Sequence, residues 1–391
     1  MNKESQIDEL LTRGVSEVID KEHLKKALLS GKKLRVKLGI DPTSPNLHIG
    51  RMVTLLKLRD FQELGHQAVF IVGDFTGIIG DTSDKEAERK MLGQEVVQKN
   101  MQTYKEQASK ILDMDRAEVR HNSEWLGKLN FGEIGRLADQ FSLAEFVARE
   151  NIKKRMDAGN RVSLRELLYP LMQGYDSIAV EADVELGGTD QRFNLLAGRT
   201  LQKNYNQGPQ DILMTNLILG TDGRKMSSSW GNTINLTEDP KEMFGKVMSV
   251  PDDIIITYFV HCTRVPMEEV TEYEKQLASG KVNPRDIKMK LAFEITKLVW
   301  GKEGAEEGQK HFTSVFQEHE VPEDVPKFEM AGESIVDVLV ASQLASSKSD
   351  ARRLLEQGSI KVNEMVVKSA EEIVEKDSVV QKGKRFFVKV V

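Results

Sequence analysis

Cysteine is nearly absent from this chain of 391 residues, in which Cys262 is the single example. One cysteine excludes an intrachain disulfide framework and any metal site built on several cysteines. Hydrophobic residues make up 39% of the chain, but none of their runs reaches the roughly 18 to 20 residues of a membrane-spanning helix. The first five residues are polar and charged and lack the apolar core of a secretory signal. We therefore expect a cytoplasmic protein with no membrane partner.

Positive charge is also limited, because 55 Lys and Arg residues stand against 61 Asp and Glu residues, a net charge of −6. This balance argues against binding nucleic acid over a broad surface. Residues 335–391 carry 10 basic and 8 acidic residues, a net charge of +2, which leaves −8 on the rest of the chain. A mildly basic tail on an acidic body indicates local contact with RNA through one face.

The first 240 residues have the pattern of an α/β domain. Apolar spacing predicts an amphipathic helix over residues 3–30. A strand, a helix and a second strand follow, which together make a βαβ unit and predict a Rossmann-like parallel sheet. The predicted strands are 34–40, 68–72, 178–186 and 212–219, and the predicted helical stretches are 48–64, 86–113 and 131–157.

After residue 240 the pattern becomes helical, and we expect an α-helical domain over residues 241–320. Proline and glycine predict a linker over residues 321–334. Residues 335–391 read as a small α+β domain, in which short helices precede strands. These strands are predicted at 360–362, 379–380 and 386–391.

A first motif, Asp41-Pro42-Thr43-Ser44-Pro45-Asn46-Leu47-His48-Ile49-Gly50, lies where the 48–64 helix begins. A helix N-terminus has unpaired N–H groups and a partial positive charge, so it attracts phosphate. A histidine there can donate to a phosphoryl oxygen, and a glycine leaves room for an adenine ring. A short His-x-Gly sequence is also typical of an ordinary helix start with an incidental histidine.

A second motif, Lys225-Met226-Ser227-Ser228-Ser229, lies far downstream, after a turn at residues 221–224. A lysine on a loop that moves can neutralise the β- and γ-phosphates of ATP as pyrophosphate leaves, with Mg²⁺ sharing the charge. Loops rich in lysine and serine are common without any such role.

Together the two motifs resemble the ATP-handling motifs of class I aminoacyl-tRNA synthetases. The chain departs from them at Arg51, where the family usually has a second histidine, and at Ser228, where it more often has a second lysine. The resemblance implies catalytic roles for His48, Arg51, Lys225, Ser228 and Thr43. It implies ATP contacts for Gly39, Asp41, His48, Gly50, Gly188, Asp190, Lys225, Met226, Ser227, Ser228 and Ser229.

The amino acid is indicated by Tyr169, Gln173 and Asp176, which fall on one face of a helix at spacings i, i+4 and i+7. Among leucines, these polar groups would be costly to bury without partners. A polar stripe facing solvent is the alternative. The spacing resembles the amino-acid pocket of tyrosyl-tRNA synthetases, and the segment 182–191 resembles the strand and turn that follow it in that family.

By that resemblance, Tyr169, Gln173 and Asp81 hold the α-ammonium group of tyrosine, and Asp176 accepts a hydrogen bond from its phenol. Gln191 would lie near the substrate carboxylate and Asp190 would bind the ribose. Many family members have a tyrosine where this chain has Lys37. We hypothesise that Lys37 pairs with Asp74 and that both line the site.

The C-terminal segment 346–363 resembles an S4-like RNA-binding domain, although a solvated charged helix would have a similar composition. The resemblance implies tRNA contacts for Lys85, Arg89, Lys348, Arg352 and Arg353. For the chain as a whole it implies a bacterial-type enzyme that joins L-tyrosine to tRNA(Tyr) through a tyrosyl-adenylate, with release of AMP and pyrophosphate. Its ATP would be a substrate accompanied by Mg²⁺, with no metal held by the protein. A homodimer through residues 141–168 is also implied.

Three other interpretations remain open from the sequence. Tryptophanyl-tRNA synthetases share the fold and the first step, but lack the tyrosine pocket and the S4-like tail. An RNA-binding protein built on a synthetase scaffold would not require His48, Lys225, Asp81 and Asp176. A paralogue could activate tyrosine for another acceptor. The sequence does not reveal the kinetic effect of Arg51 and Ser228, the part of Lys37 and Asp74 in phenol recognition, the tRNA identity elements or any role outside translation.

Overall fold

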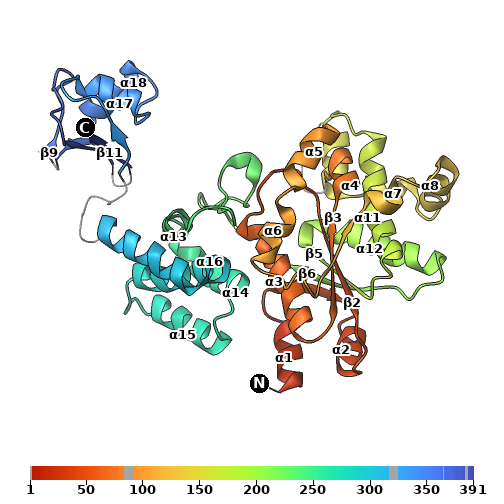
Figure 1. Cartoon of the computed structure of the whole chain (residues 1–391). Helices are drawn as coiled ribbons and strands as arrows, with labels where there is room; N and C mark the ends of the chain where they lie inside the picture. Colours follow the sequence, from red (N-terminus) through yellow and green to blue (C-terminus); the bar gives the residue numbers. More distant parts are fainter. Residues whose placement is uncertain (1, 83–90, 317–324, 364, 384–385) are drawn as a thin grey trace. The chain divides into compact units, whose positions relative to one another are not determined.

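The structure is a computed structural model that describes residues 2–82, 91–316, 325–363, 365–383 and 386–391. The chain forms two compact units, Met1–Lys302 and Glu303–Val391 (Figure 1). They divide inside one long helix, next to a kink at Gly301, where φ is 74°. The three-domain division with boundaries at 240 and 320 stays a prediction. Within the described ranges, no helix is both long enough and apolar enough to cross a bilayer.

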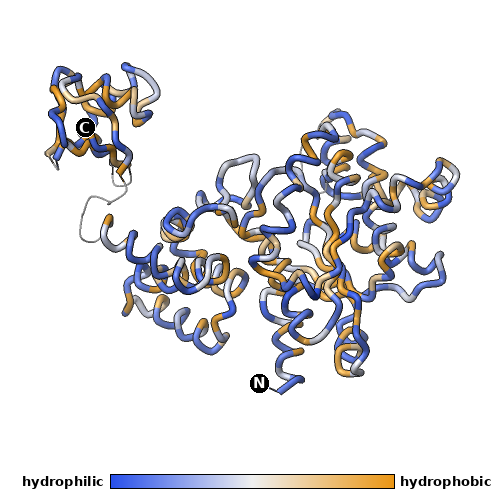
Figure 2. The backbone as a smooth tube through the Cα atoms, in the orientation of Figure 1, coloured by the Kyte–Doolittle hydropathy of each residue, from blue (hydrophilic) through white to orange (hydrophobic). Residues whose placement is uncertain are grey.

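The first unit is built on a six-stranded sheet with the strand order β1-β6-β5-β2-β3-β4. All neighbouring strands are parallel except the edge pair β1 and β6, which is antiparallel. The strands are β1 (Val15–Ile19), β2 (Arg35–Ile40), β3 (Gln67–Val72), β4 (Glu118–His121), β5 (Val184–Gly188) and β6 (Asp211–Thr215). Figure 2 shows that the central strands of this sheet are hydrophobic. The predicted Rossmann-like parallel sheet is confirmed.

Helices lie on both sides of this sheet (Figure 1). Those that precede residue 205 are α1 (Lys3–Leu10), α2 (Lys21–Leu29), α3 (Ile49–Glu63), α4 (Asp74–Ile79), α5 (Gln94–Met101), α6 (Tyr104–Ser109), α7 (Ser123–Leu126), α8 (Phe131–Ala138), α9 (Leu143–Val147), α10 (Glu150–Asp157), α11 (Leu164–Ala179) and α12 (Arg192–Asn204). The helical stretches expected around 48–64 and 131–157 are confirmed. The stretch expected over 86–113 contains α5 and α6, and its start lies outside the described residues.

Two sequence predictions near strands are wrong. The helix predicted over residues 3–30 is interrupted by β1, because Gly14 turns the chain at a φ of 63° and Val15 then pairs with Thr215 of β6. Asp20 begins α2 and its side chain accepts from the N–H of His23. The strand predicted to begin at residue 178 begins at Val184, because α11 continues to Ala179.

The strand order shows at which edge of the sheet a ligand site is expected. From β2 the chain moves outward to β3 and β4 on one side, and later returns to add β5 and β6 on the other side. Loops that leave the carboxyl ends of β2 and β5 therefore diverge. In open parallel sheets ligands bind at such a switch point. The first motif follows β2, and the segment with Asp190 follows β5.

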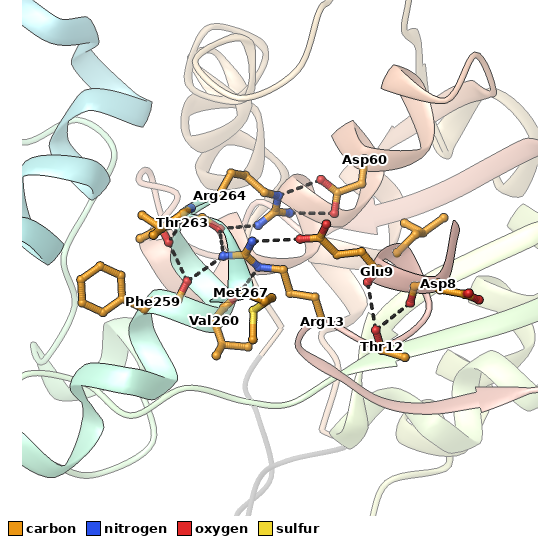
Figure 3. A network of polar contacts seen from close by, with 12 residues as sticks. Asp8, Glu9, Thr12, Arg13, Asp60, Phe259, Val260, Thr263, Arg264 and Met267 are labelled. Atoms are coloured by element: carbon orange, nitrogen blue, oxygen red, sulfur yellow. Dashed lines mark hydrogen bonds and ion pairs between the residues drawn. The ribbon is translucent and has the colours of Figure 1, made fainter. Parts of the chain in front are cut away.

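The helices α13 (Pro240–Met248), α14 (Ile255–Cys262), α15 (Met267–Ala278) and α16 (Pro284–Phe316) follow the sheet. Within the first unit, α14 is held to the sheet domain by the polar network in Figure 3. Arg13 pairs with Glu9 at 3.1 Å, and Arg264 binds Asp60 of α3 through two contacts of 2.8 Å. The buried guanidinium of Arg13 also donates to backbone carbonyls at the end of α14, those of Phe259, Val260 and Thr263.

The second unit, beyond the end of α16, has a five-stranded sheet in the order β7-β11-β10-β8-β9. Its elements are β7 (Lys327–Phe328), α17 (Ile335–Ala341), α18 (Lys348–Glu356), β8 (Ile360–Val362), β9 (Met365–Val366), β10 (Val379–Lys382) and β11 (Phe386–Val390). The predicted α+β character is confirmed. Within the predicted linker 321–334, β7 pairs with β11 in parallel and so belongs to the sheet. The bounds of the linker stay a prediction.

Candidate active site

The two phosphate motifs lie side by side although 170 and more residues separate them. His48 forms a β-bridge with Asn235, and the N–H of Ile49 donates to the carbonyl of Ile234 at 2.9 Å. Gly50 is required by this proximity. A Cβ on Gly50 would lie 2.9 Å from the ring of His48 and 3.4 Å from the sulfur of Met226. The expectation that the motifs act together therefore has a structural basis.

His48 is the N-cap residue of α3, in extended backbone geometry. Burial, helped by the nearby charges of Arg51 and Lys225, lowers the pKa of His48 to about 3. Its imidazole is therefore neutral at pH 7. Its Nδ1 atom is buried and has no hydrogen-bond partner among the described residues. A neutral imidazole at a helix N-terminus is suited to donate one N–H to a phosphate oxygen.

The loop of the second motif is tethered to both sides of the switch point. The Nζ of Lys225 lies 3.2 Å from Oδ2 of Asp190, which follows β5. The side chain of Met226 is buried, and the hydroxyl of Ser228 lies 3.4 Å from that of Ser44 in the first motif. The side chain of Arg51 is exposed, and its charge acts on His48. Lysine, serine and arginine thus border the region between His48 and Asp190.

Asp176 on α11 is a buried carboxyl group of this region, with 3% of its surface exposed. Trp125 donates its indole N–H to one oxygen at 2.7 Å, and the amide of Asn122 donates to the other at 3.2 Å. Burial raises the pKa of Asp176 to about 7, although these two donors and the charge of Lys37 oppose the rise. The carboxylate is therefore held rigidly and still has lone pairs for a ligand.

A second group of polar side chains lies around Tyr169, about two turns before Asp176 on α11. The phenol of Tyr169 donates to Asp41 at 2.8 Å, and the amide of Gln191 donates to Asp81 at 2.7 Å. Burial raises the pKa of Asp41 to about 6. A phenol that donates its proton in this way keeps its oxygen as an acceptor. Tyr169 and Asp81 therefore present acceptors, as a cation site requires.

The predicted pair of Lys37 with Asp74 is wrong. The Nζ of Lys37 lies 2.9 Å from Oε1 of Glu185 on the neighbouring strand. Asp74 instead accepts from the backbone N–H and the hydroxyl of Ser123, at 2.9 and 2.6 Å. The side chain of Lys37 leaves β2 on the face of the sheet that α11 covers, whereas Asp74 begins α4 beyond the end of β3.

The remaining predicted residues lie near the two motifs of the first unit, outside the described residues, or in the second unit. The N–H of Thr43 donates to the carbonyl of Asp41, and a Cβ on Gly188 would lie 2.6 Å from the carboxylate of Asp190. Gly39 lies near the carboxyl end of β2. Ser227 and Ser229 flank Ser228 in the loop of the second motif. Lys85 and Arg89 lie outside the described residues.

The three basic residues of the second unit that are predicted to contact tRNA lie on α18. Lys348 pairs with Asp337 at 2.7 Å, and Arg353 pairs with Asp350 at 2.5 Å. All three predicted cations, including Arg352, are exposed to solvent. Exposed pairs of this kind contribute little stability and exchange readily for another anion.

Sequence reasoning missed the residues that hold the site from behind, namely Asn122, Trp125, Ser177, Glu185 and Gln210. Asn122 and Trp125 follow β4, a short and polar strand that the hydrophobic pattern does not indicate. Glu185 was seen only as part of the strand that leads to Asp190. Its position opposite Lys37 in the parallel pair of β2 and β5 is the signal that would have found it.

Comparison with known proteins places both parts of the chain. Residues 29–317 match the family described as class I tRNA synthetases (W and Y), and residues 317–390 match the C-terminal domain of SYY-like tyrosine–tRNA ligases. A tyrosine–tRNA ligase of Dehalococcoides mccartyi (strain CBDB1) is 46% identical over 392 residues, which cover 99% of both chains. One of Thermotoga maritima is 46% identical over 394 residues, covering 100% of this chain and 98% of the relative.

Solved structures are similar over the larger part of the chain. A C-terminally truncated mitochondrial tyrosyl-tRNA synthetase of Coccidioides posadasii superposes with a TM-score of 0.64 at 25% identity, over 78% of this chain and 91% of that chain. A tyrosyl-tRNA synthetase of Archaeoglobus fulgidus in complex with L-tyrosine gives a TM-score of 0.62 at 24% identity, over 79% and 100% of the two chains. This second likeness concerns the fold alone.

Proposed function

The chain belongs to the tyrosyl-tRNA synthetases of class I, which attach tyrosine to tRNA(Tyr) through a tyrosyl-adenylate, and from this premise we propose how its own residues divide the work. The observation that carries the proposal is the buried carboxylate of Asp176, with Trp125 and Asn122 donating to its two oxygens.

Asp176 reads the phenol of tyrosine. The phenol O–H donates to a lone pair of the carboxylate, which Trp125 and Asn122 hold in place. Phenylalanine lacks the hydroxyl and would leave this carboxylate buried with one acceptor position unfilled. A site built to bind a hydroxyl strongly rejects the analogue without it, and tyrosyl-tRNA synthetases are themselves the standard example of this principle. Selection of tyrosine therefore needs no separate editing site.

The α-ammonium group of tyrosine binds the acceptors around Tyr169. The phenol oxygen of Tyr169 remains an acceptor because its O–H donates a hydrogen bond to Asp41 at 2.8 Å. Asp81 supplies a negative charge and is oriented by Gln191 at 2.7 Å. Gln173 completes the set with its amide oxygen. Three acceptors match the three N–H donors of an ammonium group, and Gln191 lies next to them on the side of the substrate carboxylate.

Adenylate formation then joins this site to the phosphate motifs. An oxygen of the tyrosine carboxylate attacks the α-phosphorus of ATP and forms a new O–P bond. The bond from the α-phosphorus to the oxygen that bridges to the β-phosphorus breaks, and pyrophosphate leaves with that oxygen. His48 donates to an oxygen of the α-phosphate, and Lys225 neutralises the leaving phosphates. Asp190 binds the ribose hydroxyls. This contact replaces the 3.2 Å ion pair of Asp190 with Lys225. Thr43, Arg51 and Ser228 border the phosphates.

Mg²⁺ bound to the ATP phosphates would supply further positive charge beside Lys225 as pyrophosphate leaves. The described part of the chain contains no group of three or more His, Cys, Asp or Glu side chains placed to hold a metal ion. Catalysis by these residues is mainly orientation and electrostatic stabilisation, because the carboxylate and ATP already provide the nucleophile and the leaving group. In the second step the terminal ribose hydroxyl of tRNA attacks the tyrosyl carbonyl, and AMP leaves.

The enzyme works as a cytoplasmic homodimer that contacts tRNA with α18. Apolar side chains in and near the proposed interface segment support the dimer: Phe131, Leu143 and Leu164 are 91%, 66% and 76% exposed. Large apolar side chains with this exposure are available for burial against a partner chain. On α18, Lys348, Arg352 and Arg353 would exchange acidic neighbours for tRNA phosphates, a contact weakened by salt.

ATP–pyrophosphate exchange, measured in parallel with tyrosine, phenylalanine and tryptophan, tests this division of work. We expect exchange with tyrosine and little or none with the other two. Exchange with tryptophan would contradict the role of Asp176. No exchange with any of them would make Arg51 and Ser228, the departures from the family motifs, responsible for a lost first step.

A further inference from the structure

A fully buried ion pair lies directly behind the proposed tyrosine site. Lys37 of β2 and Glu185 of β5 are register partners in the parallel sheet, and their side chains are 0% and 1% exposed. Their charged atoms are 2.9 Å apart. The side chains reach the face of the sheet on which α11 lies, since both contact residues of that helix.

Every donor of Lys37 is already used by the protein. Its Nζ contacts Oε1 of Glu185, the carbonyl of Gln173 at 2.8 Å and the hydroxyl of Ser177 at 2.9 Å. An ammonium group has three N–H donors. Lys37 therefore has none left for the substrate phenol, and it cannot take the place of the tyrosine that many family members have here.

Both oxygens of Glu185 are used as well. Oε1 accepts from Lys37 and from the side-chain amide of Gln173 at 3.0 Å. Oε2 accepts from Ser177 at 3.1 Å and from the side-chain amide of Gln210. The pair and its neighbours thus form a closed network that joins β2 and β5 to α11.

The network fixes the orientation of the Gln173 side-chain amide. An ionised carboxylate only accepts hydrogen bonds, so the NH₂ end of the Gln173 amide must face Glu185. The oxygen end of that amide is thereby turned away from the pair. Lys37 supports this arrangement twice, because its ammonium group pairs with the buried carboxylate of Glu185 and also donates to the backbone carbonyl of Gln173.

Stability alone gives little reason for such a pair. Replacing a buried ion pair by apolar residues of similar volume is often neutral or stabilising, because both charges lose their hydration. The direction that a carboxylate imposes on an amide has no apolar equivalent. We propose that Lys37 and Glu185 are positioning residues that orient Gln173 toward the α-ammonium group and so make the site select amino acids over analogues without the amine. The proposal rests on the ammonium role of Gln173 proposed above.

The test compares L-tyrosine with 3-(4-hydroxyphenyl)propionate, which has the same phenol and carboxylate but no amine. Dissociation constants of both are measured on the full-length wild type and on the double variant K37M/E185Q. This variant removes both charges together, so it leaves no unpaired charge in the core. We expect tyrosine to bind about 10-fold to 100-fold more weakly, and the binding of the analogue to change less than about 2-fold.

Two further variants make the result specific. Gln173→Met should weaken tyrosine by a similar factor, and adding it to K37M/E185Q should cause no further loss, since residues that act as one unit are not additive. Lys57→Met is the matched control. Lys57 is a buried lysine of α3 that donates to the carbonyl of Leu10 at 2.8 Å, away from this network. Its loss should leave both dissociation constants unchanged.

Equal weakening of tyrosine and of the analogue in K37M/E185Q would show general damage and overturn the proposal. Unchanged binding of tyrosine in K37M/E185Q, together with weaker binding in Gln173→Met, would overturn the positioning role while keeping the proposed role of Gln173. Unchanged binding in Gln173→Met would remove both roles at once.

Discussion

Replacing Asp176 by asparagine tests the phenol site with a change of one atom. The shape of the side chain is kept, but its charge and half of its acceptor capacity are lost. Trp125 and Asn122 donate to the two oxygens in the native protein. In Asp176→Asn one of these donors faces an NH₂ group and loses its acceptor.

The magnitude follows from the hydrogen bond that disappears. A hydrogen bond to a charged group contributes about 1.5 to 3 kcal/mol, so kcat/KM for tyrosine should fall roughly 10-fold to 100-fold at 1.36 kcal/mol per tenfold. For phenylalanine the change removes a buried carboxylate with one acceptor position that the substrate leaves unfilled, and kcat/KM should rise about 10-fold. The ratio of the two values should therefore fall by about 10² to 10³.

Pyrophosphate exchange at varied concentrations of tyrosine and of phenylalanine gives kcat/KM for each amino acid. Asp211→Asn is the control, because Asp211 is equally buried, with 3% exposed, and lies at the start of β6. The control should keep the ratio of the wild type. A ratio in Asp176→Asn within about 3-fold of the wild type would refute the reasoning, since it would place the phenol elsewhere.

Three further predictions follow from the charges and contacts of the first unit. His48→Ala should lower kcat for pyrophosphate exchange about 10²-fold with little change in KM for tyrosine, because only the transition state loses a donor. Because burial raises the pKa of Asp176 to about 7, the accepting carboxylate forms as the pH rises, and the kcat/KM ratio of tyrosine to phenylalanine should increase between pH 6 and pH 8. Arg13→Met should lower the free energy of unfolding in urea by about 3 kcal/mol, since the backbone carbonyls at the end of α14 lose their donor; an unchanged midpoint would contradict this.

Local chemistry made much of the site predictable from the sequence. The turn after β2 and the helix N-terminus at His48 are signalled by residues that lie next to one another in the chain. Tyr169, Gln173 and Asp176 share a helix, so their spacing alone places them on one face. In each case the information needed was contained within about three turns of helix or less.

Contacts between distant segments were not predictable in the same way. The partner of Lys37 was wrongly predicted, because it depends on which strands are neighbours and in which register, and Lys37 and Glu185 meet across β2 and β5. The short strand β4 is polar and half-buried, so periodicity did not reveal it or the residues Asn122 and Trp125 that follow it. The apolar residues of the edge strand β1 also fit a helical spacing, so the sequence pattern predicts a helix there.

The central point of the proposed mechanism is the direction in which tyrosine lies between Asp176 and the acceptors around Tyr169. A crystal structure of the enzyme with a non-hydrolysable tyrosyl-adenylate analogue would show this directly. We predict the phenol oxygen about 2.5 to 3.0 Å from the carboxylate of Asp176 and the ammonium nitrogen about 2.7 to 3.2 Å from Gln173 and Asp81. A phenol without contact to Asp176, or an amine facing Glu185 in place of the Gln173 amide, would contradict it.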